Sequence, residues 1–385
     1  NSGHNLAVGQ GVPGHELGAT AADMQLNRPR GLALNHRADI VVADQNNNRI
    51  VELKRTIDGP RIVASQLSLD PATVLAGPES PCDTAEPGCL YAEDGNDPSA
   101  WRFNAPASVS WDFAQCTADD DCVQEDGQPW CAQPDGLDCI RCDTVSGRCY
   151  SQRIDPFGVA YRVPTPVVGD ALYVADQGNH RIRRLNFFPA AGGPTSETVI
   201  GTGIAGNDAN ALFREGDTVP VSSPVGVLVV NPADLGLAGN LPIRNFIIVV
   251  DRNNHMLQLF ADFPGFGVRL VARIGTGSEG GADGYFTSPD PADVPPGEAV
   301  TLASFSYPRG LSFDPVNRVI IVVDAIDRMR TLTITKVPEG LNDKLNGQVA
   351  TVTEGTFASD DGDTDALHDV LMHSSQGNTA LFHRA

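Results

Sequence analysis

The chain has 385 residues, enough for one large repeat domain or two to three ordinary domains, and it carries 27 Lys and Arg against 48 Asp and Glu, a net charge of −21. Such an acidic surface repels phosphate backbones, which argues against a nucleic-acid partner. The 39 Gly and 28 Pro indicate a turn-rich protein. No apolar run approaches the roughly 20 residues of a membrane-spanning helix, so we expect no membrane span in this segment.

The first 81 residues contain three elements that recur later in the chain. They are a glycine-rich loop at 9–14, a Pro-x-Gly-apolar stretch at 29–32, and the run DIVVADQNNNRIVEL at 39–53. Short runs of Val, Ile and Leu bounded by Asn, Asp and Gly are typical of strands. The Asn residues after Asp44 favour a turn into the next strand. We therefore expect residues 1–81 to form a first repeat unit of strands and a linker.

All eight cysteines lie in the segment 82–149, which interrupts the repeat. An even number of Cys residues separated by Asp, Gly and Pro favours disulfides formed outside the cytosol, in an extracellular, cell-surface or periplasmic protein. Zinc is the alternative, although only Cys139-x-x-Cys142 has the spacing of a ligand pair. We expect four disulfides within this insertion, with Cys82 to Cys89 as a local bridge. The eight residues are Cys82, Cys89, Cys116, Cys122, Cys131, Cys139, Cys142 and Cys149.

The same insertion is strongly acidic and rich in tryptophan. It holds 14 Asp or Glu against three Arg, a net charge of −11, and all three tryptophans of the chain, Trp101, Trp111 and Trp130. One interpretation is a surface loop whose Trp residues pack against its own sulfur atoms. The other is a contact surface, because Trp is over-represented at binding hot spots. The second interpretation makes the three tryptophans interaction candidates.

Residues 150–385 repeat the elements of the first 81. The Pro-x-Gly-apolar stretch returns at 156–159, 224–227 and 308–311, the strand-turn-strand run returns at 172–185, 246–260 and 319–332, and the glycine loop returns at 201–206 and 275–280, with worn copies at 75–80 and 352–357. The runs are anchored by Asp44, Asp176, Asp251 and Asp324, at intervals of 132, 75 and 73 residues. Without the insertion, the repeat is one unit of about 75 residues. A unit of about four antiparallel strands repeated in this way is typical of a β-propeller blade.

The glycine loops also fit the G-x-G-x-x-G spacing of a dinucleotide-binding loop. That chemistry needs a helix directly after the glycines, whose N-terminus binds the pyrophosphate. The loop at 275–280 is followed instead by Gly, Asp and a series of prolines up to Pro296. We therefore expect a linker from the outer strand of one blade to the inner strand of the next, and we predict no cofactor.

These motifs resemble the NHL-repeat family of β-propellers, which usually have six blades. The best copy is Pro156 to Val159 followed by YVADQGNHRI at 173–182, which contains Asn179 and His180. The resemblance spans about four fifths of the chain and implies an all-β propeller, but such propellers include enzymes, binding platforms and sensors. Met256 and Met329 stand where the motif has Arg, and Asp327 stands where it has Asn. We expect the turns of these two blades to lack a contact.

The resemblance implies structural roles for the polar residues of the turns. His180 and His255 follow their aspartates by four residues, and Arg49 and Arg181 follow theirs by five, so we expect all four to support the turns. Some amidating lyases of this fold hold zinc with several histidines on inner strands, whereas here only His36 lies beside such a strand. No catalytic residue is predicted. A metal-dependent lyase or hydrolase with a site at the channel mouth stays an alternative.

Two acidic clusters raise the question of calcium. Asp360, Asp361, Asp363 and Asp365 lie close together near the C-terminus, and Asp119 to Asp121 form a run in the insertion. Neither has the twelve-residue spacing or the terminal Glu of an EF-hand. The first cluster also coincides with a linker between blades, so a solvated turn is the default and a calcium- or ligand-sensing propeller the alternative.

The repeats give four complete blades and, at 345–385, part of a fifth. Residues 4–11 resemble an outer strand that arrives without the three strands that should precede it. Because an open ring leaves unpaired strand edges, we expect a five- or six-bladed ring completed by a longer polypeptide or by another chain. The sequence thus predicts an exported, non-catalytic NHL-type propeller that acts as a protein-interaction or structural scaffold. Its partners would be other proteins, further copies of itself or a larger extracellular assembly.

Overall fold

The structure is a computed structural model of the 385-residue chain. It describes residues 11–19, 21–35, 40–53, 55–57, 67–69, 73–78, 97–113, 116, 122, 140–143, 148–154, 160–164, 170–187, 189, 192–237, 243–286, 302–315, 317–325, 328–336 and 346–352. Within these residues the regular structure is almost entirely antiparallel strand, and the only helices are 3₁₀ turns of three residues each. The protein is therefore all-β, as expected.

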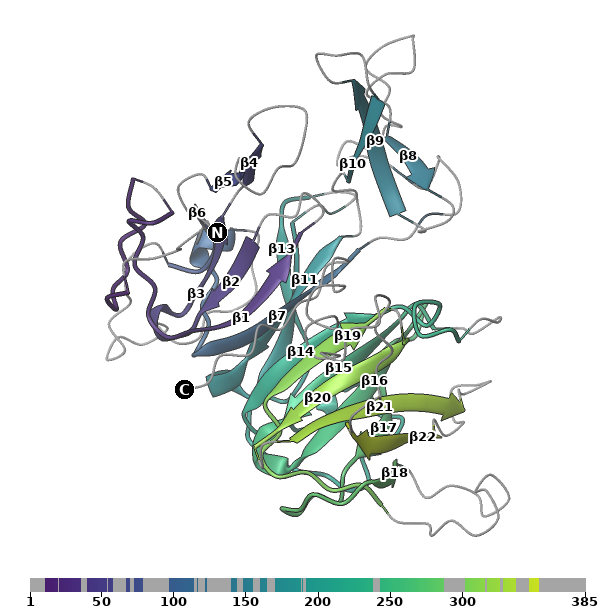
Figure 1. Cartoon of the computed structure of the whole chain (residues 1–385). Coiled ribbons are helices and arrows are strands. Elements are labelled where there is room, and N and C mark those ends of the chain that lie inside the picture. Colours follow the sequence, from purple (N-terminus) through teal and green to yellow (C-terminus); the bar gives the residue numbers. More distant parts are fainter. Residues whose placement is uncertain are drawn as a thin grey trace, which may run out of the picture. The chain divides into compact units, whose positions relative to one another are not determined.

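The chain divides into two compact units. The first comprises residues 1–106, 111–172 and 184–197, and the second comprises residues 107–110, 173–183 and 198–385. Three sheets have four strands and a fourth has five, and their strands are antiparallel neighbours as in propeller blades. Figure 1 shows these sheets, each a twisted set of neighbouring arrows. These sheets support a propeller-type fold.

The first sheet follows the order predicted for a blade. Its strands, in the order of the sheet, are β1 (Pro29–Leu34), β2 (Ile40–Asp44), β3 (Arg49–Leu53) and β6 (Thr73–Ala76), with the 3₁₀ turn η1 (Gln45–Asn47) between β2 and β3. A separate pair, β4 (Arg55–Ile57) and β5 (Leu67–Leu69), precedes β6 in the chain. The small core of this sheet consists of Ala21, Met24, Val42, Val51 and Leu53.

The third sheet is the most regular. It consists of β14 (Pro224–Val230), β15 (Asn245–Asp251), β16 (Met256–Phe263) and β17 (Gly267–Ile274), with η6 (Gly216–Thr218) before β14 and η7 (Arg252–Asn254) between β15 and β16. Every residue of β14, β15 and β16 is buried. A sheet buried on both faces reads as a continuous apolar run, which is why these strands lack an alternating pattern.

The fourth sheet packs against the third. Its strands, in the order of the sheet, are β18 (Gly284–Phe286), β22 (Asn346–Thr351), β21 (Arg328–Lys336), β20 (Val319–Asp324) and β19 (Gly310–Asp314). One continuous core joins the two sheets, and its larger members include Phe246, Leu259, Phe263, Phe286 and Phe305. Each such buried side chain contributes on the order of 1.5 to 3 kcal/mol. The apolar runs of the third and fourth repeats thus hold these two sheets together.

The second sheet differs from the prediction in its inner strand. It consists of β13 (Thr195–Ile200), β12 (Arg181–Asn186), β11 (Ala171–Asp176) and β7 (Pro106–Asp112), with η5 (Gln177–Asn179) between β11 and β12. The Pro-x-Gly-apolar stretch at 156–159 predicts that the inner strand of this blade lies at 158–162. Instead β10 (Ala160–Pro164) pairs with β9 (Arg148–Ile154), which also pairs with β8 (Ile140–Asp143). The domain boundaries at 81/82 and 149/150 stay a prediction, although β7 lies inside the cysteine-rich segment and serves the repeat.

Serine side chains of β7 explain why this strand fits beside β14. The Oγ atom of Ser108 accepts a hydrogen bond from Val227 N at 3.3 Å, and the Oγ atom of Ser110 accepts one from Val229 N at 3.0 Å. These alternate residues of β14 turn their N–H groups away from β15, so the two hydroxyls satisfy donors on the open edge of the strand. Ser108 occupies the place that Gly226 has in β14, where an added Cβ would lie 2.6 Å from a methyl group of Val250.

Candidate functional site

A buried aspartate ends the second strand of each repeat. The four residues are Asp44, Asp176, Asp251 and Asp324, at the ends of β2, β11, β15 and β20, and each is at most 2% exposed. Carboxylates at equivalent positions of successive sheets are the natural place to look for a site. Whether they can do chemistry depends on which bonds they already make.

The carboxylate of Asp44 makes three hydrogen bonds within the protein. Its Oδ1 accepts from Asn27 N at 2.7 Å, and its Oδ2 accepts from Asn47 Nδ2 at 2.7 Å and from Arg49 Nε at 2.9 Å. The Arg49 side chain is itself buried and also donates to the carbonyl oxygen of Gln25 at 3.3 Å. The expectation that Arg49 supports the turn is confirmed. A buried carboxylate with these partners fixes the backbone of the turn.

The asparagine of the turn connects it to the glycine loop that precedes the sheet. Asn47 Nδ2 donates to the carbonyl of Gly14 at 2.7 Å as well as to Asp44. Asn254 Nδ2 in the same way donates to Gly206 O and to Asp251 Oδ2, both at 2.7 Å. The third glycine of the G-x-G-x-x-G spacing therefore serves as an acceptor for a structural amide.

The first glycine of each loop packs against the preceding turn. Gly201 has φ +97, and an added Cβ would lie 2.4 Å from the carbonyl oxygen of His180. Gly77, in a worn copy of the loop, has φ +101 and lies in the same way against Asn48. The loops at 201–206 and 275–280 follow the outer strands β13 and β17, and among the described residues no helix longer than three residues follows them. The loop at 201–206 leads to the inner strand β14, as predicted, whereas the loop at 275–280 leads first to β18, the outermost strand of the fourth sheet.

Hydrogen bonds also join the turns of the first three repeats to the sheet that follows each of them. The last residue of the turn is left-handed, with φ 53 at Asn48, 53 at His180 and 51 at His255. Its side chain accepts from the backbone nitrogen of the residue before the next inner-strand proline. The three bonds are Ala105 N to Asn48 Oδ1 at 2.8 Å, Ser223 N to His180 Nδ1 at 3.1 Å and Tyr307 N to His255 Nδ1 at 3.3 Å.

These bonds define the state of the two histidines. A ring nitrogen that accepts a hydrogen bond carries no proton, so both rings are neutral with the proton on Nε2. Burial lowers the pKa of His180. The predicted structural roles of His180 and His255 agree with these contacts.

The loss of the motif's arginine in the third repeat is compensated. Met256 lies opposite Asp251, where Arg49 lies opposite Asp44. Two residues further along β16, Gln258 Nε2 donates to Asp251 Oδ2 at 2.7 Å. The expectation that this turn lacks a contact is therefore wrong, because a neutral amide takes the place of the guanidinium.

In the fourth repeat the strand register places Arg328, and not Met329, at the position of the motif's arginine. Asp324 lies opposite Arg328, so the turn contains three residues instead of four and Arg328, not Met329, occupies the motif position. Arg328 NH1 nevertheless donates to Gly281 O at 2.6 Å, and the buried Arg330 approaches Asp324 Oδ2 at 3.7 Å. Because this turn is one residue shorter than the others, the sequence motif aligned Met329 with the arginine position that Arg328 occupies. Asp327 lies outside the described residues.

The turn carboxyl of Asp251 has a raised pKa. Burial raises the pKa of Asp251 to about 6, against the opposing effect of hydrogen bonds from Asn254, Ser222 and Gln258 and the charge of Arg273. Burial also lowers the pKa of Arg273. The replacement of a charged partner by Gln258 leaves this carboxyl without a direct ion pair.

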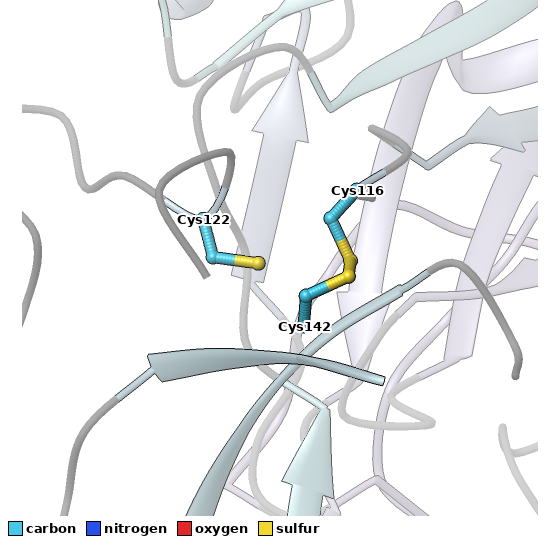
Figure 2. Close-up of side chains that lie close together, drawn as sticks. All are labelled: Cys116, Cys122 and Cys142. Carbon is cyan, nitrogen blue, oxygen red and sulfur yellow. A yellow bond between two sulfur atoms is a disulfide. The ribbon is translucent and has the colours of Figure 1, made fainter. Parts of the chain in front are cut away.

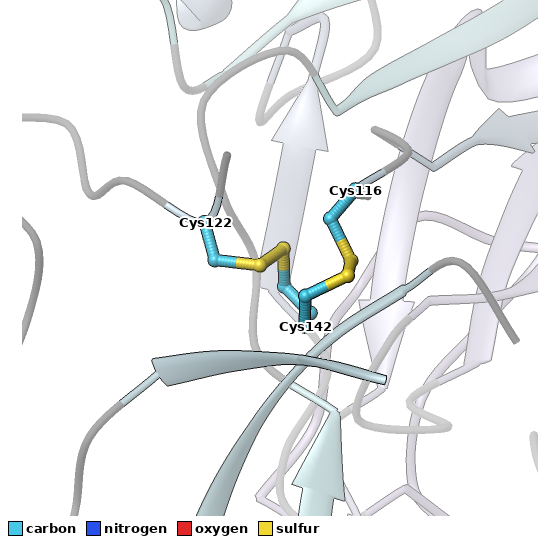
Figure 3. The surroundings of a disulfide bond; sticks show 4 residues. Cys116, Cys122 and Cys142 are labelled. Atoms are coloured by element: carbon cyan, nitrogen blue, oxygen red, sulfur yellow. A yellow bond between two sulfur atoms is a disulfide. The ribbon is translucent and has the colours of Figure 1, made fainter. Parts of the chain in front are cut away.

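Two disulfides form the only concentrated group of potential metal ligands among the described residues. Cys116 bonds to Cys142, and Cys122 bonds to Cys149. The Sγ atoms of Cys116, Cys122 and Cys142 lie within 4.8 Å of one another. Figure 2 shows the sulfur of Cys122 beside the Cys116–Cys142 bond, and Figure 3 adds the second disulfide next to the first. Sulfur atoms shared in disulfides are not thiolate ligands, so this arrangement favours the disulfide interpretation over zinc.

The disulfides hold the hairpin of β8 and β9. Cys142 and Cys149 are opposite each other in the register of the two strands, and each bonds to a residue that precedes the hairpin in the chain. Cys116, Cys122 and Cys149 are buried together. Cys82, Cys89, Cys131 and Cys139 lie outside the described residues, so the predicted bridge from Cys82 to Cys89 stays a prediction.

Two of the three tryptophans proposed as contact residues are buried. Trp101 is 0% exposed and its ring lies 5.7 Å from that of Phe187, and Trp111 is 5% exposed and lies 6.2 Å from the same ring. They pack in an aromatic cluster instead of facing a partner, because β7 and the segment before it belong to the repeat. Trp130 lies outside the described residues, as do the calcium candidates Asp360, Asp361, Asp363 and Asp365.

Sequence reasoning missed Gln258, Ser108 and Ser110. The signal for the serines was present, because Pro106-Ala-Ser-Val keeps the Pro-x-Gly-apolar pattern with Ser for Gly. Gln258 lies two residues after Met256, on the same face of the strand, and this spacing is the sequence signal that it could replace the missing arginine. Only the strand register shows that this position reaches the aspartate.

Comparison with known proteins adds little at the level of sequence. No family model and no curated protein matches the chain. Among the described residues, no helix is long and apolar enough to cross a membrane.

Solved structures offer distant likenesses. An auxiliary nutrient binding protein from Bacteroides ovatus is 13% identical, with a TM-score of 0.37, and the match covers 86% of this chain and 61% of that protein. An auxiliary nutrient binding protein from Bacteroides thetaiotaomicron is 14% identical, with a TM-score of 0.35 and coverage of 85% and 60%. The periplasmic gluconolactonase of Pseudomonas aeruginosa is 14% identical, with a TM-score of 0.33 and coverage of 90% and 83%. The chain thus spans about three fifths of the length of the two nutrient binding proteins it matches.

Proposed function

We propose that this chain forms an exported, non-catalytic β-propeller of the NHL type that acts as a protein-interaction or structural scaffold. The observation that supports this proposal best is the use of the turn residues. Asp44 and Asp251, with Asn47 and Asn254, bond to backbone and side-chain partners of their own fold. Groups engaged in this way give the repeat a rigid turn and leave function to the surface.

The cysteine-rich segment supports export and supplies the proposed contact surface. Disulfides persist in oxidising compartments, which is consistent with the bonds at Cys116 and Cys122. The segment 82–149 carries a net charge of −11. The burial of Trp101 and Trp111 moves the proposed contact from these rings to the acidic side chains of the segment and to Trp130.

Because 82–149 contains no lysine, its contacts can be tested through its carboxylates. The native protein in its own culture medium or envelope fraction would be treated with a carboxyl-activating reagent and a dihydrazide, which together cross-link carboxylates. The products would be mapped by mass spectrometry. We expect cross-links from the segment 82–149 to a second protein or to a second copy. Cross-links confined to exposed carboxylates of the repeats, such as Asp217, would contradict the proposed surface.

Metal content separates the scaffold from the two alternative functions. Protein purified without chelator would be analysed by elemental mass spectrometry. The scaffold proposal predicts less than one equivalent of any divalent metal, at about the background level of a chelator-treated control. Stoichiometric zinc would favour the lyase or hydrolase, and stoichiometric calcium would favour the sensor.

A further inference from the structure

Two consecutive backbone N–H groups precede the inner-strand proline, and two different turns bind them. In the third sheet, Ser222 N donates to Asp251 Oδ1 of the same sheet at 2.7 Å, and Ser223 N donates to His180 Nδ1 of the preceding repeat at 3.1 Å. In the fourth sheet, Ser306 N donates to Asp324 Oδ1 at 2.9 Å and Tyr307 N donates to His255 Nδ1 at 3.3 Å. The histidines thus make a polar contact from one repeat to the next.

The donor residues adopt a costly backbone conformation. Ser223 has φ 58 and Tyr307 has φ 45. Left-handed backbone costs roughly 1 to 2 kcal/mol for an L-residue, and the following proline restricts the residue further. The hydrogen bond from the backbone N–H to the histidine is one of the interactions that hold this conformation. Its loss should therefore destabilise the contact between the two repeats.

A histidine can accept this bond only while it is neutral. Protonation places a hydrogen on Nδ1, which then faces the backbone N–H donor instead of accepting from it. The equivalent contact in the first repeat uses Asn48, whose Oδ1 accepts from Ala105 N at 2.8 Å. An amide oxygen does not titrate in the physiological range.

We propose that His180 and His255 make the contacts between the second, third and fourth repeats sensitive to acid, whereas Asn48 keeps the contact between the first and second repeats independent of pH. This response to acid needs no ligand. It would loosen the junctions at Ser223 and Tyr307 while the junction at Ala105 persists.

The charged groups around His180 belong to two turns. In its own turn, Asp176 is buried and accepts from Asn179 Nδ2 at 2.8 Å, and Arg181 donates to Thr198 Oγ1 at 3.1 Å. From the next repeat, Asp251 binds the neighbouring amide of Ser222. Both carboxylates are already engaged, and Arg181 opposes a second positive charge beside it.

The charged groups around His255 also come from two turns. Its ring lies 4.2 Å from that of Tyr307, and the guanidinium of Arg252, in its own turn, lies 5.6 Å from the centre of the same tyrosine ring. From the next repeat, Asp324 binds Ser306 N and approaches the buried Arg330. As at His180, the nearby carboxylate already has its own partners, so it is not free to take up the imidazolium.

Asparagine is the natural replacement for both histidines. Asn48 occupies the same left-handed position and makes the same bond, and Asn tolerates that backbone better than most residues. The variant His180→Asn with His255→Asn should therefore keep both junctions at neutral pH and remove their response to acid. The variant with Ala at both positions should lose the junction bonds at every pH.

Amide hydrogen exchange of the full chain, followed by NMR between about pH 7.5 and pH 5 and corrected for intrinsic rates, tests this directly. We expect the protection of the amides of Ser223 and Tyr307 to fall at least about tenfold relative to that of Ala105 when the pH is lowered from about 7.5 to about 5. In the double Asn variant the three amides should keep a constant ratio. Equal changes at Ala105, Ser223 and Tyr307 in the natural protein would overturn the proposal, as would an unchanged acid response in the Asn variant.

Discussion

The Nε2 atom of Gln258 lies 2.7 Å from Oδ2 of Asp251 and donates a hydrogen bond to it. In the first repeat the corresponding oxygen of Asp44 receives its bond from Arg49, whose side chain comes from a position two residues earlier in the strand register. The same buried acceptor is thus satisfied from two different places. This relationship leads to the first two predictions.

Replacing Gln258 should destabilise the third repeat. Gln258→Leu removes a donor from a buried carboxyl, which should lower the free energy of unfolding by roughly 1 to 3 kcal/mol. The measurement is urea denaturation at pH 7. Gln348→Leu is the control, because Gln348 is exposed on β22. Equal stability of the two variants would show that the bond to Asp251 contributes nothing.

A glutamine should be able to replace Arg49 as the donor to Asp44 in the first repeat, as Gln258 does for Asp251 in the third. Arg49→Met leaves Asp44 buried without its cation and should cost roughly 3 to 5 kcal/mol, the range for breaking a buried ion pair. Val51 occupies the register position of Gln258. We expect Arg49→Met with Val51→Gln to recover about 1 to 2 kcal/mol of that loss.

The control for this pair is Val51→Gln alone, which should be destabilising because it buries an extra amide beside an occupied carboxylate. Independent, additive losses in the double variant would contradict the prediction. Recovery would show that the turn needs a donor to the aspartate, and that its position can move by two residues.

The raised pKa of Asp251 predicts a definite sign for the dependence of stability on pH. The native state holds this proton more tightly than the unfolded chain, so the stabilisation is present below about pH 4 and is lost as the pH rises through about 6. The difference between a pKa of 3.8 and one of about 6 corresponds to at most about 3 kcal/mol.

The opposite slope that His180 contributes must be removed to see this effect. His180 has a lowered pKa, so it destabilises the native state as the pH falls below about 6.5. We would compare the Asp251→Asn variant with its parent in the background that carries Asn at 180 and 255. The parent should lose stability relative to the Asp251→Asn variant between about pH 4 and 6. A constant difference across that range would show that the pKa of Asp251 is not raised.

The two disulfides restrict how the remaining cysteines can pair. With Cys116–Cys142 and Cys122–Cys149 formed, the other four cysteines allow three pairings. We predict Cys82–Cys89, which leaves Cys131 with Cys139. Peptide mapping of the unreduced protein checks this, and any bridge from Cys82 or Cys89 to Cys131 or Cys139 would contradict it.

Local patterns in the sequence were sufficient for the repeats. Asp44, Asp176 and Asp251 each end a strand and begin a 3₁₀ turn, because the apolar run before them and the Asn-rich run after them act over a few residues. The roles of Arg49 and of the glycine loops followed from the same spacing. The bond from Arg49 to Asp44, for example, joins residues that are five apart in the chain.

Features decided by distant contacts were not predicted. β7 forms the inner strand of the second sheet although Ala160–Pro164 follows the better motif, because pairing with β11 depends on packing across 58 residues of intervening chain. Trp101 and Trp111 pack against Phe187, which is also far from both of them in the sequence. Arg328 was missed for another reason, since the turn is one residue shorter and the residue opposite Asp324 therefore comes one position earlier in the sequence.

The central claim is that the turn aspartates stabilise the fold, and the free energy of unfolding of Asp176→Ala tests it most directly. Asp176 is buried and its Oδ2 accepts from Asn179 Nδ2 at 2.8 Å. We predict a loss of roughly 1 to 3 kcal/mol in urea denaturation, against less than about 0.5 kcal/mol for the exposed control Asp217→Ala. Stability equal to that of the natural protein would contradict the account and make Asp176 a candidate site residue.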